Sequence, residues 1–187
     1  MKKYLSDAEV AVLSQKIHRG QTTADGGPYY LHPEAVSEIA VGFARDALKS
    51  GACDLLLRDF SPAEIISITF QASRLHDTFE DQPRRANPEK FLRLGVHPEV
   101  VKRVTMLTRT EGMPYGEEIL HISQDVIATF CKRGDLCHNS RAERVATLLP
   151  SRDISRVLAA QQKYLLSYLF LSGALPREQY VEFAKSF

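Results

Sequence analysis

The sequence predicts an all-α fold, and three observations lead to this prediction. Apolar residues recur three or four positions apart in one segment after another, as they do on the inner face of an amphipathic helix. No run of four or more residues shows the strict alternation of apolar and polar side chains that is typical of a half-buried strand. Helix-start signals are also clear. In Ser61-Pro62-Ala63-Glu64, Ser61 is expected to be the N-cap and Glu64 to close a capping box.

The first half of the chain divides into helices and loops at its Gly and Pro residues. A first amphipathic helix is expected over residues 6–19, followed by a loop over 20–33 and a second helix over 33–49 that ends near Gly51. The helix that begins at Ser61 is expected to continue to about residue 81, because Gln82 and Pro83 then interrupt it.

The second half is expected to be helical as well. Asn87-Pro88 begins a short helix to residue 94, Pro98 begins another to residue 107, and a polar loop covers 108–116. The remaining helices are expected over residues 117–123, 125–148, 152–171 and 176–186, with Gly134 weakening the second of these.

Composition describes one ordinary globular domain over residues 1–187. The chain of 187 residues is long enough for one core and short for two, and 44% of its residues are hydrophobic. A formal charge of +1 gives no reason to expect nucleic acid or an anionic membrane as a partner. No apolar run approaches a membrane span, the N-terminus lacks the core of a signal peptide, and three cysteines form no Cys-x-x-Cys pair. A cytoplasmic protein with reduced thiols is expected.

Leu75-His76-Asp77-Thr78-Phe79-Glu80-Asp81 is the most informative segment. On a continuous helix, positions four apart nearly superpose, so His76 would lie above Glu80 and Asp77 above Asp81 within an arc of roughly 140°. The opposite face carries apolar residues that would anchor the helix on a core: Ile65, Ile68, Ala72, Leu75 and Phe79. Adjacent His-Asp pairs also arise by chance, and Glu-Asp pairs are usually solvated, so the interpretation depends on the rest of the chain.

Two further segments supply residues that would complete a metal site. His32 stands at the expected loop-to-helix junction, and Asp135 and Asn139 share a helix face with Lys132 close by. Each has a simpler explanation, as a loop histidine, a surface ion pair or a capping amide. Taken together, two imidazoles and two carboxylates suit Mn²⁺, Fe²⁺, Co²⁺ or Zn²⁺ better than Mg²⁺ alone. Four such ligands leave positions on a six-coordinate ion for water and a phosphate oxygen.

These motifs resemble those of a known superfamily. Gly26-Gly27-Pro28-Tyr29-Tyr30-Leu31-His32-Pro33, the Leu75–Asp81 segment and Lys132-x-x-Asp135-x-x-His138-Asn139 are similar to motifs of the HD-domain phosphohydrolases. Within that superfamily they most resemble the hydrolase domain of RelA/SpoT proteins and the stand-alone small alarmone hydrolases. The likeness covers residues 18–144, including a first motif, His18-Arg19-Gly20-Gln21, and leaves the helices of 152–186 to pack over the bundle.

The resemblance implies a compact multi-helix bundle with a single metal site, occupied by manganese or another divalent transition metal. It implies that His32, His76, Asp77 and Asp135 bind the ion, that Glu80 and Asp81 are the catalytic carboxylates, and that Asn139 positions the attacking water or the nucleotide. The implied reaction removes pyrophosphate from the 3′ position of guanosine tetra- or pentaphosphate and leaves GDP or GTP. Lys132, Arg141 and Arg144 are candidates to bind the pyrophosphate, and Arg84 and Arg85 are weaker ones; each has an equally plain interpretation as surface charge.

Two departures from the family pattern concern the nucleotide. Thr23 occupies the position of an arginine that packs on the guanine base in the family, and Ala142 replaces a threonine shortly after the asparagine. A second hypothesis therefore stays open, in which the chain is an HD phosphohydrolase that acts on another nucleotide, such as an NADP-type phosphate ester or a deoxynucleotide. A non-catalytic module that binds nucleotide or a partner protein is a third hypothesis, although such modules generally lose the ligands or acids retained here.

Overall fold

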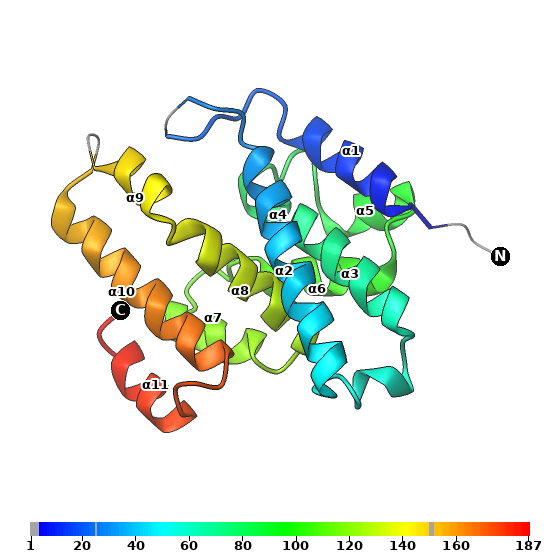
Figure 1. Cartoon of the computed structure of the whole chain (residues 1–187). Helices are drawn as coiled ribbons and strands as arrows, with labels where there is room; N and C mark the ends of the chain where they lie inside the picture. Colours follow the sequence, from blue (N-terminus) through cyan, green and yellow to red (C-terminus); the bar gives the residue numbers. More distant parts are fainter. Residues whose placement is uncertain (1–3, 25, 150–151) are drawn as a thin grey trace.

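The computed structural model describes residues 4–24, 26–149 and 152–187, and this part of the chain is helical, with no strand (Figure 1). Residues 1–3 of the N-terminal segment and residue 25 of the loop expected over 20–33 lie outside it. An isolated backbone bridge joins Thr22 and Pro28. The elements in chain order are α1 (Asp7–Ile17), α2 (Leu31–Ser50), the 3₁₀ turn η1 (Leu56–Arg58), α3 (Pro62–Leu75), α4 (Thr78–Asp81), α5 (Pro88–Leu94), α6 (Pro98–Leu107), α7 (Tyr115–Ile122), α8 (Val126–Asn139), α9 (Ala142–Leu148), α10 (Ile154–Leu171) and α11 (Arg177–Ala184).

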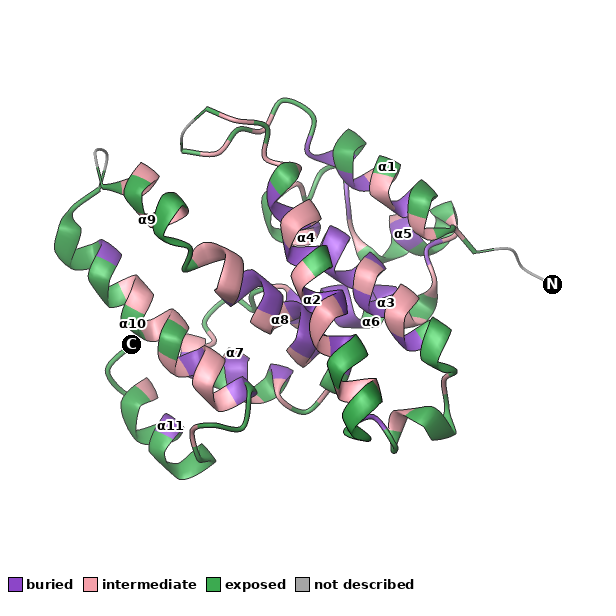
Figure 2. Cartoon of the chain, viewed as in Figure 1, coloured by how far each residue is buried: buried purple, intermediate pink, exposed green. Residues whose placement is uncertain are grey.

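Helices α2, α3 and α8 pack together at the centre of the molecule, where Figure 2 shows most of the buried residues. The predicted apolar face of α3 is confirmed, because Ile65, Ala72 and Leu75 are fully buried and Ile68 is nearly so. Helices α1, α5 and α6 cover one side of this centre, and α10 lies against α8 on the other (Figure 1). The three central helices therefore bring together segments that are far apart in the sequence.

The predicted helix starts follow the expected physical chemistry. Ser61 caps α3, and the Glu64 carboxylate accepts a hydrogen bond from the Ser61 backbone N–H at 2.8 Å, so the capping box is complete. The same arrangement begins α1 at Ser6 and Glu9. Asn87 accepts a hydrogen bond from the backbone N–H of Lys90 and caps α5. These caps satisfy backbone donors that a helix cannot pair internally.

The predicted continuous helix over residues 61–81 is wrong, because it is divided at His76-Asp77 into α3 and α4. Asp77 has φ −92° and ψ −4°, and the Thr78 hydroxyl donates to the Leu75 carbonyl at 2.6 Å. A side-chain hydroxyl that binds the backbone in this way competes with helix continuation. Glu80 and Asp81 therefore belong to the separate turn α4, which is linked back by the hydrogen bond from the Asp81 N–H to the Asp77 carbonyl at 2.9 Å.

The predicted helix over residues 125–148 is also divided, into α8 and α9. Arg141 has φ −63° and ψ 136°, an extended conformation that ends the helical path after Asn139. In Figure 1, α9 continues beyond the end of α8 in much the same direction, and a cavity lies between α9 and α10. The other predicted bounds differ by a few residues, and η1 was not predicted.

Helix α10 packs on α8 and α7, and α11 packs on α10 and α7. Tyr180 of α11 is fully buried, stacks on Phe170 with ring centroids 4.5 Å apart, and shares a 3.1 Å hydrogen bond with Ser167. All three cysteines are free thiols. In the described residues, none of the helices has the length and apolar character needed to cross a membrane.

Gly134 is required for close packing rather than being a weak point of its helix. A Cβ at this position would lie 2.8 Å from the Val36 carbonyl oxygen and 3.2 Å from the Ala40 Cβ on α2. Gly42, on α2 itself, has open space where its Cβ would stand. The two helical glycines therefore predict opposite effects of the same substitution.

We expect Gly134→Ala to lower the free energy of unfolding by about 1–3 kcal/mol, because overpacking outweighs the gain in helix propensity. Gly42→Ala is the matched control and should raise it by up to about 1 kcal/mol. Urea denaturation monitored by circular dichroism measures both. Equal stabilisation by the two substitutions would show that α2 and α8 do not approach closely at Gly134.

Candidate metal centre

The four predicted metal ligands converge from three parts of the central bundle. His32 comes from the first turn of α2, His76 and Asp77 from the break between α3 and α4, and Asp135 from α8. His32 Nε2 lies 3.4 Å from an oxygen of Asp77 and 3.4 Å from one of Asp135. His76 Nε2 lies 3.0 Å and 3.7 Å from the same two oxygens. His32, His76 and Asp77 form a group whose ligand atoms are close enough together to bind one ion, and Asp135 is not part of that group.

His76 presents a nitrogen that fits a metal ion. Its Nδ1 donates to the Ser73 carbonyl at 2.8 Å, which directs Nε2 toward the two carboxylates. Nε2 is buried and has no hydrogen-bond partner of suitable geometry among the described residues. Burial alone would lower the pKa of His76, but Asp77 and Asp135 raise it well above its usual value. The same negative field attracts a divalent cation.

His32 is oriented by a second histidine that sequence reasoning assigned no role. The Nδ1 atoms of His32 and His138 lie 2.8 Å apart. Burial and the neighbouring His32 lower the pKa of His138 to about 4, so His138 is neutral at physiological pH and can accept the His32 Nδ1–H. That hydrogen bond leaves His32 Nε2 free to bind an ion, which is how outer partners commonly orient ligating histidines. His138 is part of the motif that runs from Lys132 to Asn139, and nothing else in the sequence indicated a role for it.

Asp77 is held by Tyr29, from the loop before α2. The Tyr29 hydroxyl donates to Asp77 Oδ2. Burial, followed by the charge of Asp77, raises the pKa of Tyr29, so the phenol remains a donor. Burial alone would raise the pKa of Asp77, yet His76 and His32 hold it well below its usual value. Tyr29 and the two histidines therefore hold Asp77 in place as a charged carboxylate.

Asp135 is held by two neighbours on α8, and this changes the interpretation of both. Lys132 Nζ lies 2.8 Å from Asp135 Oδ2, and the Asn139 amide donates to Oδ1. Burial alone would lower the pKa of Lys132, but Asp135 raises it, so the ammonium stays charged. Lys132, predicted to bind substrate, is thus paired with a predicted metal ligand. Asn139 orients the same ligand while also lining the neighbouring cavities.

The predicted catalytic carboxylates stand on α4, beside the ligands. Glu80 is exposed and accepts a hydrogen bond from the Arg109 backbone N–H. Asp81 accepts one from Gln21 Nε2 at 2.7 Å, and Gln21 in turn contacts His18 Nδ1 at 2.8 Å. The first motif therefore supports Asp81. That link joins residues sixty positions apart and has no local sequence signal.

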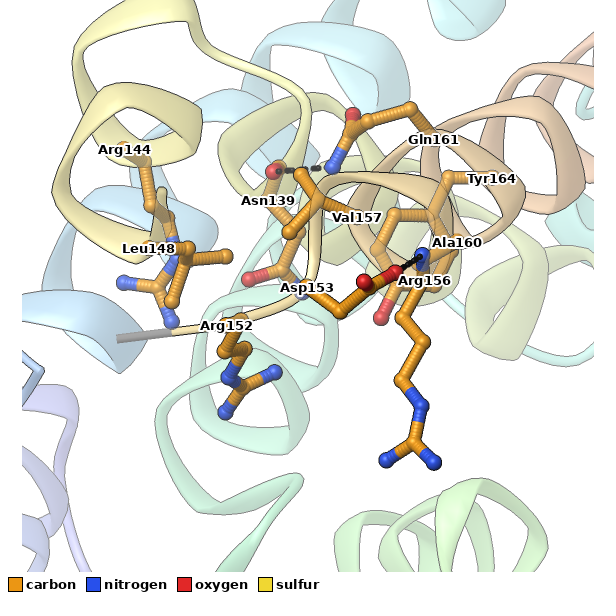
Figure 3. Close-up of a pocket in the computed structure, with 10 residues that line it drawn as sticks. All are labelled: Asn139, Arg144, Leu148, Arg152, Asp153, Arg156, Val157, Ala160, Gln161 and Tyr164. Atoms are coloured by element: carbon orange, nitrogen blue, oxygen red, sulfur yellow. Dashed lines mark hydrogen bonds between the residues drawn. The ribbon is translucent and has the colours of Figure 1, made fainter. Parts of the chain in front are cut away.

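Three cavities adjoin this centre. A cavity of about 210 Å³ is lined by Glu80, Asp135 and Asn139. Lys163 and Arg109 also line it, and neither cation was predicted from the sequence. A cavity of about 590 Å³ is lined by His32, Tyr29 and Thr23, the residue that departs from the family pattern. Arg141 and Arg144 line it as well. A third cavity, of about 550 Å³, lies beyond Asn139, between α9 and α10 (Figure 3).

The remaining positions singled out from the sequence lie outside these cavities. Ala142 is exposed at the start of α9. Arg85 donates to the backbone carbonyls of Ile17 and Arg19, which gives it a structural role, and Arg84 is exposed.

No protein-family model matches the chain, and a search of curated proteins gives no match either.

We expect the purified protein to bind Mn²⁺ and His76→Ala to weaken that binding by more than about a hundredfold, since second-shell changes alone cost 10–100-fold. Isothermal titration calorimetry with Mn²⁺ measures this, and His121→Ala, at an exposed histidine of α7, is the control. Failure of the unsubstituted protein to bind any divalent transition metal would refute the site.

The hydrogen bond from Tyr29 predicts a smaller effect. Tyr29→Phe should weaken Mn²⁺ binding by about tenfold, because Asp77 loses the donor that fixes it. Tyr30→Phe removes the neighbouring hydroxyl, for which no hydrogen bond is found in the described residues, and should leave Mn²⁺ affinity unchanged. Equal affinities for the two variants would mean that Tyr29 does not position Asp77.

Proposed function

We propose that this chain is a divalent-metal-dependent phosphohydrolase of the HD type that acts on a nucleotide. One observation carries the proposal: two imidazoles and two carboxylates from α2, the α3–α4 break and α8 face one another, with a buried His76 nitrogen left for an ion. The mixed nitrogen and oxygen set suits Mn²⁺, Fe²⁺, Co²⁺ or Zn²⁺.

The neighbouring side chains fit the hydrolysis of a phosphate ester. A divalent ion, when bound, lowers the pKa of water and polarises phosphate oxygens. Glu80 shares its cavity with the ligand Asp135 and is exposed, so its carboxylate can accept a proton from the attacking water. Lys163 and Arg109 line the same cavity and would offset the negative charge of a phosphate group. Asp81, held by Gln21, is the second carboxylate within the same turn.

The leading substrate is a guanosine polyphosphate cleaved at its 3′-pyrophosphate, on the motif resemblance. Thr23 favours keeping a second candidate. It lines the cavity next to His32, where the family carries an arginine for the base, and its hydroxyl donates to the Gly27 carbonyl at 3.1 Å. Threonine offers no cation to stack on guanine. A nucleotide with another base, such as an NADP-type phosphate ester, is therefore the alternative substrate.

A panel of nucleotides incubated with Mn²⁺ distinguishes these substrates by their products. Pyrophosphate released with GDP supports the alarmone reaction, and orthophosphate released from another nucleotide supports the alternative. In either case we expect Glu80→Gln to lower kcat by about 10²–10⁴-fold, because the side chain can no longer accept a proton. Mn²⁺ affinity should be retained, since Glu80 is not one of the proposed ligands.

Glu117→Gln is the control, because this carboxylate is exposed on α7 outside the cavities described above. It should hydrolyse at the rate of the unsubstituted protein. If Glu80→Gln does so too, the assigned catalytic role is wrong. If no nucleotide is hydrolysed with Mn²⁺, Fe²⁺, Co²⁺ or Zn²⁺, the proposed function is wrong.

A further inference from the structure

The cavity of about 550 Å³ between α9 and α10 is lined by three arginines that no motif includes as a set. Arg144 comes from α9, Arg152 from the segment before α10, and Arg156 from the first turn of α10. Figure 3 shows their side chains extending in the same general direction from the wall that Asn139, Gln161 and Tyr164 form. The volume is within the usual range for small-molecule pockets, and the site is polar.

These guanidinium groups are not neutralised within the described part of the chain, where no carboxylate lies within ion-pair distance of any of the three. Four other arginines in that part of the chain do form ion pairs, and Arg103, for example, pairs with Glu99 and Asp125. Asp153, the one acidic residue found to line this cavity, instead accepts a hydrogen bond from the Arg156 backbone N–H at 3.2 Å and caps α10. In a chain of net charge +1, three unpaired guanidiniums around one cavity are a local concentration of positive charge.

The cavity is adjacent to the metal centre yet separate from it. Asn139 and Tyr164 line both this cavity and the one that contains Glu80 and Asp135. Arg144 also lines the cavity next to His32. None of the four proposed ligands lines the arginine cavity itself. A ligand could therefore place one anionic group at the metal and another among the arginines.

We propose that Arg144, Arg152 and Arg156 form an anion subsite for a diphosphate group that is not cleaved. Guanidinium groups bind phosphate oxygens through paired, charge-assisted hydrogen bonds, which suits them to this task. As a statement about substrate, the proposal rests on the proposed function: the phosphate ester that is hydrolysed lies at the metal while the second group is held here. The substrate class is then a nucleoside 5′-diphosphate that carries a further phosphate group on its 2′ or 3′ oxygen.

This subsite separates the candidate substrates by chemistry. Guanosine 3′,5′-polyphosphates and NADP-type esters both contain a 5′-diphosphate besides the phosphate group to be removed. A deoxynucleoside monophosphate has a single phosphate, which would be at the metal, and leaves the arginines without a partner. The first two classes therefore fit the pair of sites, and the third does not.

The binding test uses the full chain in EDTA, so that no metal contributes. Isothermal titration calorimetry compares GDP and ADP with guanosine and adenosine. The nucleoside diphosphates should bind better than the nucleosides, and the double variant Arg152→Gln/Arg156→Gln should lose at least about tenfold in diphosphate affinity, with a weaker dependence on salt. Arg177→Gln, an exposed arginine at the start of α11, is the matched control and should bind as the unsubstituted chain does. Equal diphosphate binding by the double variant and the control would overturn the subsite.

Hydrolysis assays separate failure of the subsite from failure of the proposed function. For a substrate with a 5′-diphosphate, the double variant should raise KM by at least about tenfold with kcat little changed, because binding is lost and the reacting groups are not. Hydrolysis with an unchanged KM refutes the subsite and leaves the function standing. Arginine-dependent binding of GDP or ADP, with no nucleotide hydrolysed, supports the subsite and refutes the function.

Discussion

The central constraint of this structure is the cost of burying imidazoles and carboxylates at the meeting point of three helices. His32, His76 and Asp135 are more than nine-tenths buried, and each would destabilise the fold without partners. Each proposed ligand has a hydrogen-bond partner: His138 for His32, Ser73 for His76, Tyr29 for Asp77, and Lys132 with Asn139 for Asp135. These contacts hold the proposed ligands in one geometry. Packing and chemistry therefore depend on the same few contacts.

Patterns that act over short distances in the sequence could be predicted. The apolar spacing of α3 identified its buried face, and Ser61 with Glu64 fixed its start. Each of the four proposed ligands has a simpler explanation by itself, and they could be selected only as a set, through the resemblance of their motifs to those of the HD-domain phosphohydrolases. Their convergence is consistent with that selection, because α2, α3 and α8 pack directly on one another.

Features that depend on contacts across the fold could not be predicted. The break at His76-Asp77 separates the ligands from the carboxylates of α4, and it arises where Thr78 binds the Leu75 carbonyl and Asp77 turns toward Tyr29. Helix periodicity is nearly the same with and without such a break. The partners of the ligands are equally hidden, since Tyr29 and Asp77 are 48 residues apart and His32 and His138 are 106 apart. Only the folded chain shows that His138 faces a proposed ligand, whereas the Lys132–Asp135 ion pair spans three residues and was already an alternative from the sequence.

The residues proposed for metal binding and the residues proposed for nucleotide binding come from different parts of the chain. The motifs of residues 18–144 supply the ligands and the carboxylates, whereas α10, which has no motif, supplies Lys163 and Tyr164 to the cavity beside Glu80. Helix α9 begins after the extended residue Arg141, and it lines the arginine cavity together with the segment before α10 and α10 itself. Thr23 lines the cavity next to His32 and departs from the family pattern without being a proposed ligand. On the proposed function, a chain of this kind keeps its metal-binding residues while the helices packed around them set which nucleotide is bound, and α9, α10 and the segment before α10 supply the three arginines proposed for that role.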